Sequence, residues 1–264
     1  MSLAFPLFSG STGNSNFLQC KNTAILVDIG CSAKQLEISL IRRNLDPSKI
    51  NSIFITHEHL DHVRGLRVFA SRYKIPVYSS KGTIKFLKKR KILSDEFSFK
   101  VIPKEGVGIG DLFIKTFNLS HDCQEGVGYV IETQTGKKAA FVTDTGCITE
   151  EIRSAVRGCD LLFLESNHDV NMVACGSYPY HIKRRIISDI GHLSNEDCAK
   201  ELPELVKLGL RHIVLSHLSE NNNLTQLAYQ TCISTLLEKN MKENRDYILS
   251  VAKKSNNSCN GISF

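Results

Sequence analysis

Short apolar runs rich in β-branched and aromatic residues alternate along the chain with stretches of helical spacing. The runs are typical of strands. We predict strands at residues 3–8, 23–28, 52–56, 77–79, 112–117, 128–132, 138–143, 161–165 and 212–216. The spacing between them predicts helices over 32–43, 63–73 and 148–156. This alternation predicts an α/β fold in which helices cover mixed sheets.

Local signals support several of these boundaries. Thr149 is placed to cap the helix that begins near residue 150, and Ser194 opens another helix with Asp197 three residues later. The polar stretch 132–137 predicts a turn between two strands. The chain has 264 residues, no internal repeat and no Gly/Ser/Pro-rich linker, so we expect a single domain over residues 1–264.

The composition argues against a disordered, a membrane-spanning or a secreted protein. The chain is 42% apolar and 23% charged, which argues against disorder. No apolar run approaches the roughly 20 residues that a membrane span needs, and the first ten residues lack a secretory pattern. The nine cysteines contain no C-x-x-C pair, which favours free thiols in a reducing compartment. We therefore expect a cytoplasmic protein without a membrane partner.

The strongest chemical signal is the segment Thr-His-Glu-His-Leu-Asp-His at 56–62, where an apolar strand ends and a helix begins. Three imidazoles and a carboxylate so close together would need partners if they were buried. A metal ion supplies that partner, and these ligand types suit Zn²⁺, Mn²⁺ or Fe. In this turn His57 and His59 point to one side, while Asp61 and His62 point to a neighbouring position. The segment thus predicts half of the ligands of a dinuclear site.

This motif resembles the signature of the metallo-β-lactamase fold hydrolases, and other landmarks of that family follow in order. They are Asp28 after the strand at 23–28, His121 in Asn-Leu-Ser-His-Asp, Asp144 in Val-Thr-Asp-Thr-Gly and His217 in Leu-Ser-His-Leu. The resemblance runs from about residue 8 to residue 218. It implies a four-layer αββα sandwich of two mixed β-sheets.

The resemblance also implies the roles of these residues. The first metal site would comprise His57, His59, His121 and Asp144, and the second Asp61, His62, Asp144 and His217. Asp28 would support the metal-binding turn. Two transition-metal ions about 3.5–4 Å apart could share a hydroxide as the nucleophile and clamp a phosphate or carbonyl oxygen. Each proposed ligand follows an apolar strand, where open α/β sheets collect functional side chains.

Two further segments resemble parts of the tRNase Z-like nucleases. His192, in Gly-His-Leu-Ser-Asn, precedes a helix and matches a histidine that assists leaving-group departure. Glu165, at the end of the strand at 161–165, matches a residue that supports that histidine. With Asp61, these are the candidate catalytic residues. His168 and Asp169 follow on the same loop, where a solvated surface position is the more ordinary expectation.

The small-residue loop at 9–15, Ser-Gly-Ser-Thr-Gly-Asn-Ser, is a candidate phosphate site. Glycines let backbone N–H groups turn toward an anion, and hydroxyl groups add donors. The candidate phosphate-binding residues are Ser11, Thr12, Gly13 and Asn14. A tight loop between two strands would explain the same composition.

Together these segments and Tyr-Pro-Tyr at 178–180 resemble the YycJ/WalJ-type branch of the superfamily, which implies a metal-dependent DNA exonuclease. The chain has no room for the β-CASP region of larger nucleases and no long arm of the tRNase Z kind. A net charge of +6 permits a polyanionic partner. Basic clusters lie at 81–91, with Lys85, Lys88 and Lys89, and at 183–185. They favour binding of a nucleic-acid backbone with little sequence specificity, DNA before RNA.

Other activities fit the same ligands. A glyoxalase II-like thioesterase or a small-molecule phosphodiesterase could use the same hydroxide, although no C-terminal helical region for a glutathione conjugate is evident. A tRNase Z-type RNA-processing nuclease is a further alternative. A di-iron redox protein is disfavoured because His59 stands where such relatives usually carry Glu. A metal-bound scaffold without catalysis is disfavoured by the full set of ligands.

Overall fold

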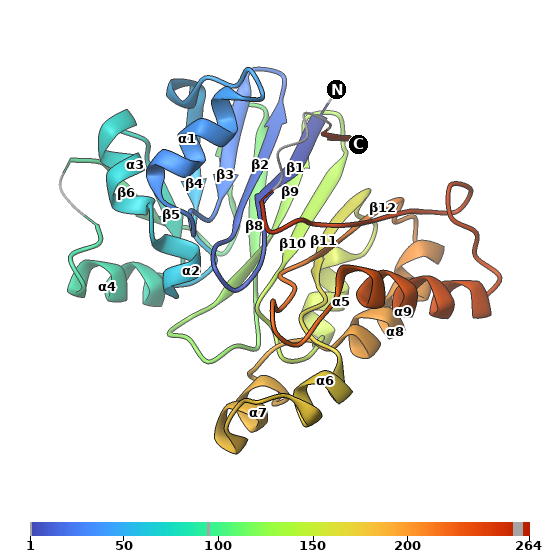
Figure 1. The fold of residues 1–264 in the computed structure, drawn as a ribbon. Helices are drawn as coiled ribbons and strands as arrows, with labels where there is room; N and C mark the ends of the chain where they lie inside the picture. Colours follow the sequence, from blue (N-terminus) through green and yellow to red (C-terminus); the bar gives the residue numbers. More distant parts are fainter. Residues whose placement is uncertain (1, 94–95, 256–260) are drawn as a thin grey trace. The chain divides into compact units, whose positions relative to one another are not determined.

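The computed structural model describes residues 2–93, 96–255 and 261–264. The strands form two seven-stranded sheets, one made of β1–β6 with β14 and the other made of β7–β13 (Figure 1). Contacts within the chain divide it into two compact units. The first comprises residues 1–116, 123–137 and 253–264, and the second comprises residues 117–122 and 138–252.

The first unit contains one complete sheet in the order β14-β1-β2-β3-β4-β5-β6. Its strands are β1 (Ser2–Phe8), β2 (Ser15–Cys20), β3 (Thr23–Val27), β4 (Ile50–Phe54), β5 (Val77–Ser79), β6 (Phe99–Val101) and β14 (Ile262–Ser263). β14, β1, β2 and β3 pair antiparallel, whereas β3 to β6 pair parallel. All five residues of β3 are buried, as expected for a strand with both faces covered.

Helices cover this sheet and complete its core. They are α1 (Ala33–Ile41), the 3₁₀ turn η1 (Pro47–Lys49), α2 (Leu60–Val63), α3 (Leu66–Tyr73) and α4 (Lys81–Lys89). α1 begins at Ser32, which forms a reciprocal capping box with Gln35. Leu36 of α1, Phe69 of α3 and Leu87 of α4 are fully buried in one apolar cluster with residues of the sheet.

The first unit also carries β7 (Val107–Ile109) and β9 (Val127–Thr133), and β8 (Leu112–Asn118) crosses its boundary. β7 and β8 pair antiparallel. β9 packs on β4, because the ring of Tyr129 meets that of Phe54 edge to face at 5.5 Å. Gly136, with φ of 78°, closes the predicted turn after β9. Its N–H donates to Thr133 O at 2.9 Å.

The prediction of one helix over 63–73 is wrong in one respect. The helix is interrupted at Gly65, which lies between α2 and α3. The N–H of Gly65 donates to Ile29 O at 3.0 Å. A Cβ at this position would lie 2.4 Å from Cys31 O. The break therefore comes from close packing of Gly65 against the segment after β3, which a helical pattern does not reveal.

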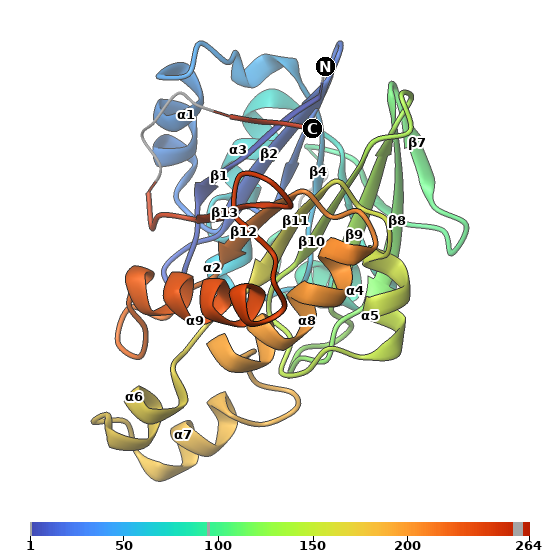
Figure 2. The ribbon, with the colours of Figure 1, turned by 90° about the vertical axis from the view of Figure 1, so that its right-hand side faces the viewer.

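The second unit contains four parallel strands in the order β13-β12-β11-β10. They are β10 (Lys138–Val142), β11 (Leu161–Glu165), β12 (His212–Ser216) and β13 (Ile248–Val251). The helices of this unit are α5 (Glu150–Val156), α6 (Val170–Cys175), α7 (Tyr180–Ile186), α8 (Asn195–Lys207) and α9 (Thr225–Glu238). α8 and α9 lie side by side, while α6 and α7 extend away from them (Figure 2).

Both predicted helix caps in this unit are confirmed. Thr149 Oγ1 accepts from Ile152 N at 3.3 Å, and Ser194 Oγ accepts from Asp197 N at 3.0 Å. Among the described residues, no helix is both long and apolar enough to cross a membrane.

Three backbone segments of the first unit meet at Gly30. Its N–H donates to Asn14 O at 2.7 Å, while Asn14 N donates to Asp61 O at 2.8 Å and Ile29 N donates to His62 O at 2.8 Å. A Cβ on Gly30 would lie 1.6 Å from Asp61 O. Glycine is therefore required where the segment after β3 crosses the turn that carries Asp61 and His62.

Gly30→Ala is expected to lower the free energy of unfolding by about 2 kcal/mol or more, because the backbone of the turn must move to admit a methyl group. Denaturant unfolding followed by circular dichroism measures the change. Gly108→Ala in β7 is the matched control, since a Cβ there meets nothing within 4 Å. Equal stability of the two variants would contradict the close packing at Gly30.

Candidate metal centre

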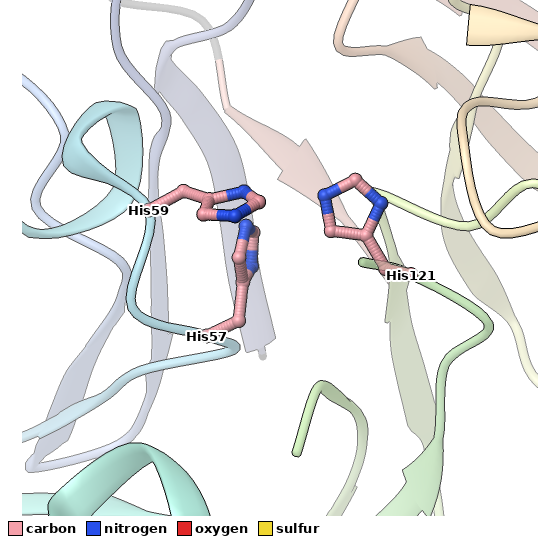
Figure 3. A group of neighbouring side chains, drawn as sticks. All are labelled: His57, His59 and His121. Atoms are coloured by element: carbon pink, nitrogen blue, oxygen red, sulfur yellow. The ribbon is translucent and has the colours of Figure 1, made fainter. Parts of the chain in front are cut away.

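Three imidazoles gather in the turn that follows β4. The ring centroids of His57 and His59 lie 4.6 Å apart, and those of His57 and His62 lie 4.2 Å apart. Figure 3 shows His57 and His59 close together on this turn. His57 and His62 are buried. The turn therefore gathers three imidazoles, a ligand type that suits Zn²⁺ and other transition-metal ions.

Asp28 fixes this turn by accepting hydrogen bonds from it. The carboxylate is 1% exposed and lies directly after β3. Its Oδ1 accepts from Thr56 N at 2.8 Å, and its Oδ2 accepts from Thr56 Oγ1 and His62 Nδ1, both at 2.8 Å. The proton of His62 is thereby held on Nδ1, so Nε2 carries the lone pair through which the ring would bind a metal ion, and in this structure that nitrogen accepts from Asn14 Nδ2. Asp28 makes the contacts expected of a residue that supports the metal-binding turn.

The loop at 9–15 differs from the predicted phosphate site. The N–H groups of Gly13 and Asn14 donate to Gly10 O at 3.0 Å and to Asp61 O at 2.8 Å, so neither faces an anion. The side chain of Asn14 is buried, and its Nδ2 lies 3.0 Å from His62 Nε2. Asn14 therefore packs against the ligand turn. Ser11 and Thr12 form the exposed tip of the loop.

In the second unit, a buried carboxylate at the end of β11 gathers four donors. Glu165 Oε1 accepts from His192 Nδ1 at 2.8 Å and from His217 Nδ1 at 2.9 Å. Its Oε2 accepts from Thr145 N at 2.8 Å and from Leu193 N at 3.4 Å. The predicted hydrogen bond between Glu165 and His192 is present. The same carboxylate also orients His217, a contact that the sequence did not predict.

The charge of Glu165 is maintained despite complete burial. Burial alone raises the pKa of this carboxyl group. The charge of His192 and the hydrogen bonds from His192 and His217 outweigh burial and lower the pKa to about 2. Glu165 is therefore an anion at neutral pH and holds a proton on Nδ1 of both imidazoles.

Asp144 and His217 stand beside Glu165. Asp144 Oδ1 lies 3.2 Å from His217 Nδ1 and 3.6 Å from His192 Nδ1. Ligand atoms of Asp144, Glu165, His192 and His217 all lie within 4.8 Å of one another. His192 has a side chain that is 14% exposed, whereas those of the other three are at most 3% exposed. Of these four groups, His192 is the one most open to a substrate.

His121 projects from the loop after β8 (Figure 3). Its Nδ1 lies 2.9 Å from Gly191 O, which accepts the proton of that nitrogen. Two more hydrogen bonds fix the same loop: Ser120 Oγ donates to Asp189 O at 2.7 Å, and Asp122 N donates to Ile190 O at 3.0 Å. The turn before His192 therefore also orients His121.

Asp144 and His217 share an unusual backbone conformation with Asp28 of the first unit. Their φ angles are 64°, 56° and 65°, and each follows the end of a strand. A non-glycine residue with positive φ is uncommon and clusters at functional sites. The three strand ends thus carry backbone strain at the residues that ligate or support the predicted metal ions.

A buried amide network lies behind the loops of the second unit. The side chains of Asn195 and Asn223 exchange two hydrogen bonds of 2.9 Å. Asn223 Nδ2 also donates to Ser166 O at 2.9 Å, and Asn167 Nδ2 donates to His217 O at 2.8 Å. The network joins the loops that carry Glu165, His192 and His217. The sequence analysis missed these asparagines, although their position beside the predicted site residues was visible.

His168 and Asp169 were expected in a solvated loop, and this expectation is wrong. Both residues are buried. Asp169 Oδ1 accepts from Met172 N at 2.8 Å and caps α6. His168 O accepts from Asn195 N at 2.8 Å, and burial lowers the pKa of its imidazole. The loop folds inward because its backbone bonds to adjacent loops: Asp169 N donates to Asn222 O at 2.9 Å. The buried Nδ1 of His168 has no hydrogen-bond partner among the described residues.

The predicted lysines lie on α4 of the first unit. Lys85, Lys88 and Lys89 are exposed, and Lys88 Nζ stands 4.4 Å from the centroid of the Phe99 ring. α4 begins at Ser80, whose Oγ accepts from Thr83 N at 3.3 Å. The helix therefore presents all three predicted cations, and Lys81 as well, to solvent.

The sequence matches the family described as Beta-lactamase superfamily domain over residues 23–218. The chain belongs to this superfamily. It is 37% identical over 236 residues to an exodeoxyribonuclease YycJ of Bacillus anthracis, with 88% of each chain covered. It is 35% identical over 244 residues to an exodeoxyribonuclease WalJ of Streptococcus pneumoniae, with 91% of this chain and 90% of that protein covered. The predicted YycJ/WalJ-like branch is confirmed.

Solved structures confirm the fold. The metallo-β-lactamase fold protein YhfI from Bacillus subtilis superposes with a TM-score of 0.72 at 15% identity, covering 96% of this chain and 97% of that chain. A diphosphatase of the PhnP family superposes with a TM-score of 0.68 at 18% identity, covering 100% of this chain and 98% of that chain. The predicted metallo-β-lactamase fold is thereby confirmed.

Proposed function

We propose that this protein is a DNA exonuclease that uses two divalent transition-metal ions. The observation that carries the proposal is that three of the candidate ligand histidines each make a hydrogen bond through Nδ1, which leaves the other ring nitrogen, Nε2, as the one that would bind a metal ion. Nδ1 of His62 contacts Asp28, Nδ1 of His121 contacts Gly191 O, and Nδ1 of His217 contacts Glu165. Metal-binding histidines almost always donate their other ring N–H to such a partner.

The donor set fits two ions. One ion would take His57, His59, His121 and Asp144, and the other Asp61, His62, Asp144 and His217. Imidazole and carboxylate ligands suit Zn²⁺, Mn²⁺ and Fe²⁺ alike. When bound, two such ions stabilise both the attacking and the leaving oxygens of a phosphodiester.

The protein itself supplies a proton donor. Glu165 holds a proton on His192 Nδ1, so Nε2 is the nitrogen left for a substrate on a side chain that is 14% exposed. We assign to His192 the protonation of the departing sugar oxygen, with Glu165 stabilising the imidazolium. We assign Asp61 to the second ion and retain it as a candidate catalytic residue.

Two further groups of residues are proposed to contact the DNA substrate. Lys85, Lys88 and Lys89 would bind the DNA backbone by charge, without reading its sequence. Ser11 and Thr12, at the exposed tip of their loop, are the remaining candidates there for a phosphate contact. DNA is favoured over RNA because both relatives are exodeoxyribonucleases.

We further propose a reducing, cytoplasmic setting. All eight cysteines in the part of the chain that the structure describes are free thiols. Burial raises the pKa of Cys31 and of Cys159 to about 12, which keeps both in the unreactive thiol form.

Digestion of nucleic acids tests the proposed function. End-labelled linear DNA should be shortened progressively in the presence of metal, whereas a closed circle should persist and a chelator should stop the reaction. Asp144→Ala is the control for contaminating nuclease, since it removes the carboxylate assigned to both ions. Efficient thioester cleavage without attack on any DNA or RNA end would favour the glyoxalase II-like alternative.

His192→Ala should lower turnover on DNA by about 10²–10⁴-fold while metal content stays unchanged, because departure of a sugar oxyanion benefits from a positioned acid. An activated nitrophenyl phosphodiester should lose much less, since its leaving group hardly needs a proton. Single-turnover rates on both substrates measure the difference. Equal losses would assign His192 to substrate placement and not to proton transfer.

A further inference from the structure

Helix α7 of the second unit carries an exposed aromatic ring beside a cation. Tyr180 is 75% exposed. Arg184, one helical turn later, places its guanidinium carbon 6.0 Å from the centroid of that ring. Ile187 continues the same face and is 56% exposed. An exposed ring beside a cation offers a face for stacking and a charge for an anionic group.

The other two cations of the cluster at 183–185 have internal partners. Lys183 Nζ donates to Ala174 O at 2.7 Å, which ties α7 to the end of α6. The guanidinium of Arg185 forms a two-pronged ion pair with Asp122, including an Nη2 to Oδ1 contact of 2.8 Å. These contacts hold α7 in place and turn the face with Tyr180 and Arg184 outward.

The same helix is joined to the loops of the candidate site. Asp122, the partner of Arg185, directly follows His121. His192 N donates to Ile186 O at 2.9 Å, at the end of α7. A ligand on Tyr180 and Arg184 would therefore be held on the element that immediately precedes His192.

The charge of this region suits a polyanion. Residues 170–188 contain three Lys or Arg residues and no Asp or Glu. Proteins that bind single-stranded nucleic acid combine cations along the backbone with aromatic rings on which bases stack. The second unit thus offers both parts of such a platform on one helix face.

We propose that Tyr180 and Arg184 bind an unpaired nucleotide of the DNA strand, with the base stacked on Tyr180 and a phosphate paired with Arg184. The inference rests on the proposed function and names the form of its substrate. Within a duplex both faces of a base are covered by its neighbours, and a terminal pair exposes one face only, so an unpaired nucleotide reaches the ring and the guanidinium most easily. We therefore expect a preference for single-stranded ends or overhangs.

The test is binding of a short fluorescent single-stranded oligodeoxynucleotide with phosphorothioate linkages, which the metal-loaded protein cleaves poorly. Fluorescence anisotropy should show affinity at least about fivefold lower for Tyr180→Ala, while Tyr180→Phe keeps it. Arg184→Gln should reduce the slope of log affinity against log salt by about one. Arg157→Gln, which removes an exposed cation at the end of α5, is the matched control.

An oligodeoxynucleotide with abasic terminal positions separates stacking from general loss of structure. On this probe wild type and Tyr180→Ala should bind equally, because no base remains to stack. Normal binding of the intact probe by both Tyr180→Ala and Arg184→Gln would overturn the inference and leave the nuclease proposal standing. A wild-type protein that neither binds nor cleaves DNA would overturn the proposed function itself.

Discussion

Two buried carboxylates, one in each unit, organise the chemistry of this protein. An ionised carboxylate without water must be satisfied by hydrogen bonds. Asp28 draws in the backbone and hydroxyl of Thr56 together with His62. Glu165 draws in two backbone N–H groups together with His192 and His217. In both units the need to satisfy a strand-end carboxylate fixes the orientation of imidazoles, which is the requirement for a metal centre.

The strain at the strand ends is a consequence of this arrangement. Asp28, Asp144 and His217 adopt positive φ within two residues of the end of a strand. Such a conformation costs of order 1–3 kcal/mol and persists only when its surroundings over-determine it. The surroundings here are hydrogen bonds: Thr56 and His62 hold Asp28, and Asn167 holds the carbonyl of His217. Stability is thus spent where ligand geometry must be fixed.

The sequence predicted the strands that end at the candidate site, because an apolar run is a local pattern, and the family resemblance named the candidate ligands. It did not predict features that depend on long-range packing. The break at Gly65 comes from close approach to Cys31 O. The burial of the loop with His168 and the hydrogen bond from Asn14 N to Asp61 O both depend on residues that are remote in the chain. The family resemblance named Asp28 and Glu165 as supporting groups, whereas the contacts of His121 with Gly191 O and of His217 with Glu165 emerge only in the folded chain.

Metal affinity in variants of the two buried carboxylates tests this explanation most directly. Purified protein should hold close to two transition-metal ions per chain by elemental analysis. Asp28→Asn and Glu165→Gln, which keep the shape but place an amide against the imidazole N–H, should each weaken metal affinity about 10- to 100-fold in chelator competition. Thermal unfolding of the metal-free variants checks that each remains folded. Two folded variants that bind both ions as tightly as the unaltered protein would contradict the central role of these carboxylates.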